Sequence, residues 1–283
     1  IKAGNKRNIP LISLLVLMAT ANLVFHLSAL GAIDVPPVAA LYAGLALIVM
    51  VECVMAGRVV PMFTKNVTPG LVINIPRKFE LALLAVTALA LALWVFAPPG
   101  PVTLVACAVA AVLHAVRLWM WHPWVTFKRP ILWILHAAYA WLPIGFVLLA
   151  LAQVGWVSYS LAVHAFGVGV TGGLIIGMVT RTARGHTGRP LQVSRPEVLA
   201  YAFVMLAAVL RAFGVCWLKQ LADRQPATAQ ALTAMQCWTV GLGALALSAS
   251  QGGLPPLPRD PGFWLAISYL AVLCTVCAFA IQN

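Results

Sequence analysis

Histidines are the side chains of this sequence that could do chemistry. Of the six in the chain, His26, His114, His136 and His164 stand inside long apolar stretches. Two histidines facing each other across a helical bundle form an arrangement that holds a b-type haem, and further histidines can bind copper. The competing interpretation is that each ring is hydrogen-bonded to a neighbouring Ser, Thr or backbone carbonyl and has only a structural role.

Long apolar runs are the elements that must position these rings. The 283 residues are 63% hydrophobic and 8% charged, with a mean hydropathy of +0.97. Since a bilayer crossing needs about 20 apolar residues, we expect about nine helices, at roughly 10–31, 35–56, 80–97, 101–121, 131–151, 157–180, 197–218, 228–249 and 261–281. This pattern predicts an all-α fold, with residues 1–283 forming a single polytopic transmembrane helical bundle.

Lysine and arginine gather in every second gap between these runs. The cationic residues are Lys2, Lys6 and Arg7 in the opening segment, Arg58, Lys65, Arg77 and Lys78 after the second run, Arg117, Lys128 and Arg129 around the end of the fourth, and Arg181, Arg184, Arg189 and Arg195 after the sixth. Cationic loops are retained in the cytoplasm, so these gaps are predicted to be cytoplasmic. The gap after the seventh run, with Lys219 and Arg224, fits this alternation poorly. A net charge of +12 then indicates attraction to anionic membrane lipid rather than to nucleic acid.

This topology sorts the histidines by depth. His26 and His164 are expected in an outer layer, and His114 and His136 in an inner layer near the cytoplasm. His186 falls in a cytoplasmic connection. Four buried rings in two layers favour a metal or haem site over four unrelated structural histidines.

Arginines next to the histidines are candidate partners for haem propionates. Arg117 follows His114 by one helical turn, where its guanidinium could meet a propionate or extend to lipid headgroups. Arg181, Arg184 and Arg189 form a cationic connection that a phosphate, a propionate or headgroups would satisfy. The nearby Trp119, Trp121, Trp124 and Trp133 are interpreted as membrane-interface anchors.

Other polar or small residues interrupt the apolar runs. Gly169, Gly173 and Gly177 recur every four residues, which lets a partner helix or a flat macrocycle approach closely. Glu52 is expected to pair with a neighbouring base or to relay protons, and Arg211 to face protein or water. Nucleotide-binding, zinc-protease and serine-hydrolase motifs are absent from the sequence. Besides a metal protein, the alternatives are a proton-coupled transporter, a lipid-binding protein without metal, or a scaffold subunit.

Four segments together resemble the NnrS family of bacterial haem- and copper-containing membrane proteins. They are GRVVPMFTKN at 57–66, LHAVRLWMW at 113–121, ILWILHAAYAWLPIG at 131–145 and HAFGVGVTGGLIIGMVTRTARGHTGRPL at 164–191. The resemblance covers roughly residues 5–220 and implies a bundle of about twelve helices, each long enough to span the bilayer.

The resemblance also implies a function. It points to a protein of the bacterial cytoplasmic membrane that holds haem b and copper and acts in nitric oxide metabolism or tolerance of nitrosative stress, with nitric oxide as a candidate ligand. Enzymatic activity and the redox partner are left open. The residues that match the family's histidines are His26, His114, His136, His164 and His186, while His122 stands where the family varies.

Two departures from the family are expected. Its opening helices, with a W-H-x-H-E-M segment, have no counterpart here, so the chain is interpreted as an N-terminally truncated fragment. Residues 221–283 do not resemble the family's basic C-terminal tail and are interpreted as atypical.

Overall fold

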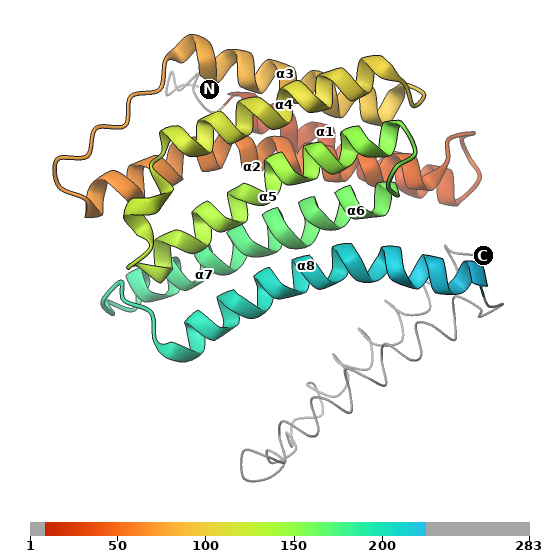
Figure 1. Ribbon diagram of the computed structural model, residues 1–283. Helices are drawn as coiled ribbons and strands as arrows, with labels where there is room; N and C mark the ends of the chain where they lie inside the picture. The colour runs from red at the N-terminus through yellow and green to blue at the C-terminus, as the bar shows by residue number, and fades with distance from the viewer. Residues whose placement is uncertain (1–8, 225–283) are drawn as a thin grey trace, which may run out of the picture. The chain divides into compact units, whose positions relative to one another are not determined.

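The computed structural model describes residues 9–224, and every regular element in that range is a helix (Figure 1). The elements are α1 (Ile9–Ala29), α2 (Pro37–Val67), α3 (Arg77–Phe96), α4 (Pro101–Met120), the 3-10 helix η2 (Pro123–Thr126), α5 (Pro130–Gln153), α6 (Tyr159–His164), the π-helix η3 (Ala165–Gly172), α7 (Gly173–His186) and α8 (Arg195–Arg224). The segments α6, η3 and α7 run on without a break. The predicted all-α class is confirmed.

Six helical segments in the described range are long and apolar enough to cross a membrane, namely α1 to α5 and the continuous span Tyr159–His186. They coincide with the first six predicted runs, and the seventh run lies in α8. The runs predicted at 228–249 and 261–281 lie outside the described residues. The chain divides into two compact units, Ile1–Leu221 and Ala222–Asn283, and a single bundle over the whole chain stays a prediction.

Helix α2 extends well past residue 56, where the predicted run ends. Residues 57–66, including Pro61, continue the helix instead of forming a connection. The polar residues of this segment had indicated a connection. Val60, Pro61 and Thr64 are buried there, so packing against neighbouring helices stabilises the segment as a helix. A proline is tolerated because a transmembrane helix embedded among others can satisfy the freed backbone group.

Helix α5 is the centre of the bundle. It contains no charged residue and packs against α2, α4, α6, η3 and α7. Inside the bundle, 56% of its apolar stretch is buried, against 6% for α1. A helix that is hydrophobic all round is expected in such a central position.

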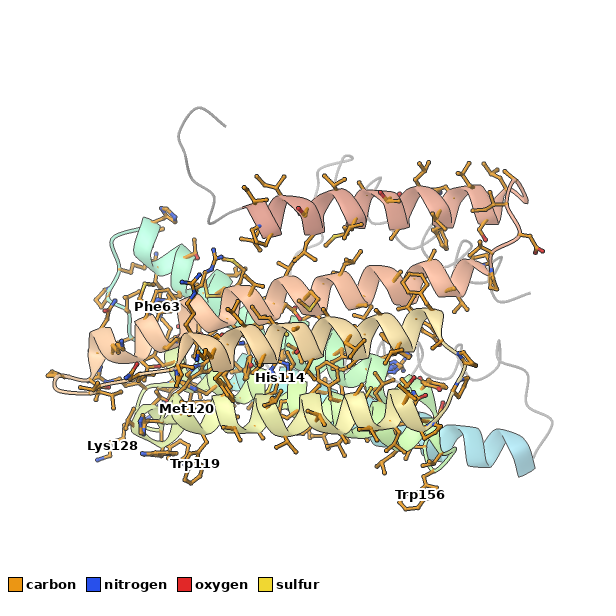
Figure 2. The ribbon with its side chains drawn as sticks, turned by 90° about the horizontal axis from the view of Figure 1, so that it is seen from above. Phe63, His114, Trp119, Met120, Lys128 and Trp156 are labelled. Carbon is orange, nitrogen blue, oxygen red and sulfur yellow. The ribbon has the colours of Figure 1, made fainter. Side chains whose placement is uncertain are left out.

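Exposed tryptophans mark the two ends of the bundle. Figure 2 shows Trp119 and Lys128 at one end and Trp156 at the other, with His114 between them. Trp119 is 70% exposed and Trp156 is 78% exposed, as expected of side chains at membrane interfaces. Trp121, by contrast, is completely buried, so its interpretation as an interface anchor was wrong.

The glycine-lined face of η3 and α7 packs directly on α5. A Cβ atom added to Gly169 would lie 2.4 Å from Cγ of Trp141. At Gly173 the added atom would lie 2.6 Å from Cβ of Ala138. Gly177 similarly meets a leucine of α5. Of the two predicted uses of this face, close helix packing is the one found.

We predict that Gly169→Ala destabilises the bundle by about 1–3 kcal/mol, because the methyl group would overlap the rigid indole of Trp141. Gly167→Ala is the matched control, since nothing lies within 4 Å of its added Cβ. Thermal unfolding of both variants in detergent would measure the difference. Equal melting temperatures for the two variants would contradict the packing.

Candidate functional site

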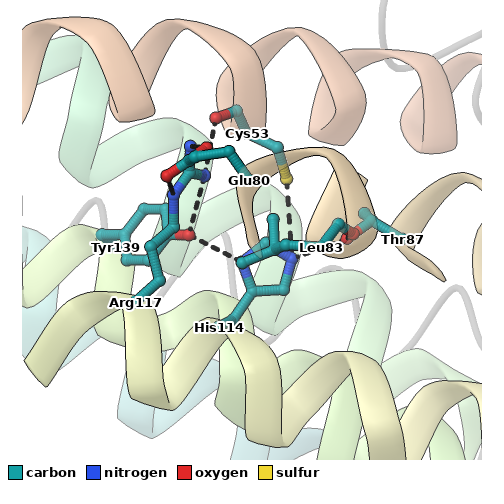
Figure 3. A network of polar contacts seen from close by, with 7 residues as sticks. All are labelled: Cys53, Glu80, Leu83, Thr87, His114, Arg117 and Tyr139. Carbon is teal, nitrogen blue, oxygen red and sulfur yellow. Dashed lines mark hydrogen bonds and ion pairs between the residues drawn. The ribbon is translucent and has the colours of Figure 1, made fainter. Parts of the chain in front are cut away.

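His114 lies at the centre of a buried network that joins four helices (Figure 3). Its Nδ1 lies 2.6 Å from the hydroxyl of Tyr139 on α5, and its Nε2 lies 2.9 Å from the hydroxyl of Thr87 on α3. Cys53 Sγ of α2 is 3.9 Å from Nε2. Phe146 stacks on the imidazole, with ring centroids 5.5 Å apart. Both ring nitrogens are therefore engaged within the protein.

The hydroxyl partners fix the tautomer of His114. Thr87 donates its only hydroxyl hydrogen to the carbonyl of Leu83, so its oxygen accepts a hydrogen bond from Nε2–H of the imidazole. Nδ1 is then the acceptor of the Tyr139 hydroxyl. Arg117 Nη1 donates to the same tyrosine oxygen at 3.2 Å, which is consistent with tyrosine donating onward to the histidine.

Arg117 is the charged member of the network and is only 1% exposed. Its Nε donates to Glu80 of α3 at 3.0 Å, Nη2 forms an ion pair with the same carboxylate, and Nη1 donates to the carbonyl of Cys53 at 2.9 Å. Gly57 of α2 leaves room for the guanidinium, since a Cβ there would lie 1.8 Å from Nη2. Of the two alternatives for Arg117, extension to lipid headgroups was wrong, because its charge is compensated inside the bundle. A role with a haem propionate stays a prediction, although every guanidinium nitrogen already has a partner.

His136 differs from His114 in having one ring nitrogen without a partner. Its Nε2 lies 3.0 Å from the hydroxyl of Thr64, and Thr64 donates its hydrogen to the carbonyl of Val60. Nε2 must then carry the proton, so Nδ1 presents a bare lone pair. This Nδ1 is buried and has no hydrogen-bond partner in the described part of the chain. This buried imidazole nitrogen, outside the network of His114, is ready to accept a ligand.

The structure does not bring His114 and His136 together on one ion. They contact Cys53 and Thr64 of α2, which are eleven residues apart and therefore about 16 Å apart along the helix. Eleven residues correspond to about three helical turns, so the two rings meet α2 at different depths. A metal held by both would need nitrogens at about 2 Å each, as in zinc sites.

The outer histidines are held by separate neighbours. His26 is exposed on α1, with its ring 5.4 Å from that of Phe25. His164 donates from Nδ1 to the carbonyl of Ser160 at 2.6 Å, and its Nε2 accepts from Arg211 Nε at 3.1 Å. Arg211, which was expected to face protein or water, is exposed and contacts protein through His164. His186 is exposed at the end of α7, and no group of three or more metal-binding side chains occurs within residues 9–224.

The three arginines after the sixth run have different surroundings. Arg184 is paired with Glu197 of α8, and Arg189 is exposed. Arg181 lies over the ring of Phe63, 3.7 Å from its centroid, and its buried Nη1 has no partner among the described residues. Only Arg181 combines burial with an open donor.

Sequence reasoning missed the residues that hold His114 and Arg117. Glu80, Cys53 and Thr87 were not identified as members of a site, although all three are polar or polarisable groups within or beside apolar runs. Glu80 carried the clearest available signal, because a carboxylate near the cationic end of a membrane helix is expected to pair with a base.

These features define a multi-pass membrane protein whose helices enclose a buried histidine, tyrosine and arginine network. A family model described as NnrS protein matches residues 1–251. The chain therefore belongs to the NnrS family, and the match extends past residue 220, where we expected the resemblance to end. No curated protein and no solved structure matches the chain significantly.

We predict that Arg117→Gln lowers the free energy of unfolding by about 3–5 kcal/mol, because it breaks a buried ion pair and leaves Glu80 uncompensated. Arg184→Gln is the control. It removes a more exposed pair, with side chains 16% and 30% exposed, and should cost much less stability, because solvent screens an exposed ion pair. Urea unfolding in detergent would measure both. Similar losses in the two variants would contradict a buried, stabilising role for Arg117.

Glu197 at the start of α8 provides a pH test outside the membrane spans. Hydrogen bonds from Arg184, and then from Ser194, lower the pKa of Glu197 from 4.5 to about 2. The contact therefore stabilises the α7–α8 connection above about pH 4.5 and is lost as the pH falls toward 2. We expect the infrared carboxylate band that disappears in Glu197→Gln to titrate near pH 2, and nearer its ordinary value in Arg184→Gln. An unchanged titration in Arg184→Gln would refute the assignment.

Proposed function

We propose that this protein binds haem and copper in the bacterial cytoplasmic membrane and acts in nitric oxide metabolism or in protection against nitrosative stress. Membership of the NnrS family supports this proposal. The observation that carries it is the buried, unprotonated and unpartnered Nδ1 of His136, because a histidine binds a metal through a nitrogen lone pair.

The described residues fit a metal group in part. His136 offers one nitrogen without any rearrangement, whereas His114 would have to give up Tyr139 or Thr87 to offer one of its own. A haem iron bound here would supply either electron transfer or an open position for nitric oxide. A second ligand to that iron is not provided by His114 in the arrangement described.

The surrounding side chains have clear roles toward His136. The Thr64 hydroxyl oxygen accepts a hydrogen bond from Nε2–H. This contact fixes the tautomer and leaves Nδ1 as the ligand nitrogen. Trp121 is completely buried and lies edge-on to the imidazole, with ring centroids 6.2 Å apart. This indole packs next to the ring and keeps water away from that side.

A metal-free, proton-coupled transporter is a second candidate, and Glu52 favours it. One carboxyl oxygen of Glu52 is buried without a hydrogen-bond partner among the described residues. The side chain lines an otherwise apolar cavity of 210 Å³ between α2, α5 and α7, together with Met55 and Met178. An ionisable group in such a place is typical of proton pathways in membrane proteins.

Haem content decides between these candidates. We expect the purified full-length protein to give a pyridine haemochrome spectrum with stoichiometric iron, and His136→Ala to lose most of it. His122→Ala is the control, because His122 lies in the connection before η2 and carries no proposed ligand role. A colourless, metal-free protein, or equal haem in the two variants, would overturn the role of His136.

A further inference from the structure

The Lys- and Arg-rich end of the bundle contains a cavity of 630 Å³. Its walls come from the end of α2, the connection before α5, the first turn of α5, α7 and the connection that precedes α8. The cavity lining includes Lys128, Arg129, Ile131, Leu132, Arg181 and Val193. Figure 2 shows Lys128 and Phe63, the aromatic partner of Arg181, at this same end.

Three cationic side chains line this cavity and no carboxylate does. Lys128, Arg129 and Arg181 come from two separate parts of the sequence, so the fold itself brings the charges together. Glu80 and Glu197, the carboxylates that form ion pairs in the described part of the chain, are bound to Arg117 and Arg184. Like charges that converge without an anion repel one another, which favours a negatively charged occupant.

Arg181 has a defined aromatic neighbour and one buried guanidinium nitrogen without a partner among the described residues. Phe63 packs against its guanidinium and holds the group in one position at the cavity wall. Its Nη1 is buried and lacks a hydrogen-bond partner among the described residues. A buried donor without an acceptor costs free energy, which a small movement of the side chain toward an anion in the cavity would recover.

The N-terminus of α5 adds to the positive potential that the cationic side chains create in the cavity. This 24-residue helix begins at Pro130, in the wall of the cavity. The N-terminus of a helix carries a partial positive charge and favours phosphate and carboxylate groups. Here it acts together with three full charges on side chains.

We propose that this cavity binds a phosphate-bearing organic anion. The phosphate lies against Lys128, Arg129 and Arg181, and the organic part packs on the accessible apolar side chains Leu191 and Val193. The volume falls within the range of about 300–1,000 Å³ typical of small-molecule sites and exceeds what an inorganic phosphate would fill. The anion is either the headgroup of an anionic phospholipid or a soluble phosphate ester. This site is separate from His136 and does not depend on the proposed haem function.

The test uses the purified full chain in detergent and measures ligand binding by native mass spectrometry. One arm adds dioleoyl phosphatidylglycerol, with dioleoyl phosphatidylcholine as the zwitterionic comparison, and the other adds glycerol 3-phosphate. We expect Arg181→Gln and the double variant Lys128→Gln/Arg129→Gln each to weaken binding at least about tenfold, the loss expected for a charge-assisted hydrogen bond. The double variant changes exposed side chains, so it tests the site even where Arg181→Gln fails to fold.

Arg189→Gln is the matched control. It removes the same charge from the same end of the protein, but Arg189 is exposed and does not line the cavity. Selective binding of phosphatidylglycerol assigns the site to lipid, and binding of glycerol 3-phosphate assigns it to a soluble ester. Equal losses in Arg189→Gln and the cavity variants, or no binding of either phosphate, overturn the proposal. A fall in haem content with unchanged phosphate binding also overturns it, in favour of a propionate.

Discussion

The positive charge of Arg117 must be compensated inside a segment that crosses the membrane, and the bundle is organised around this requirement. Glu80 supplies the countercharge from α3, the carbonyl of Cys53 accepts from α2, and Tyr139 accepts from α5. An uncompensated charge in this environment is so costly that none of these helices can slide relative to the others without breaking the network. The guanidinium therefore sets the register of four helices.

The same contacts decide what the histidines can do. Tyr139 connects Arg117 to His114, so the imidazole of His114 is part of the structural network and has both nitrogens occupied. His136 stands three residues before Tyr139 on α5, where its ring contacts Thr64 and keeps one nitrogen open. One histidine therefore serves the architecture, while the other is left available for chemistry.

The transmembrane runs, the all-α class and the glycine-lined face could be predicted from the sequence, because each depends on local composition or on spacing within one helix. The compensation of Arg117 could not, since Glu80 is far from it in sequence and belongs to another helix. The inner-layer hypothesis placed His114 and His136 by depth alone. It did not account for the different contacts of the two rings along α2, His114 at Cys53 and His136 at Thr64. The burial of Trp121 was missed because an interfacial and a core tryptophan look alike in sequence.

The π-helix η3 changes the rotation of successive side chains about the axis of the sixth span. A π-turn accommodates one residue more than an α-turn, and one residue of an α-helix corresponds to a rotation of about 100°. The wide turn at Ala165–Gly172 therefore rotates the side chains of α7 about the helix axis, relative to the positions they would have if α6 continued as an unbroken α-helix. His164, before the wide turn, contacts Arg211, whereas Gly173 and Gly177, after it, contact α5. The sixth span therefore changes its helical geometry part of the way along, without a break in the backbone.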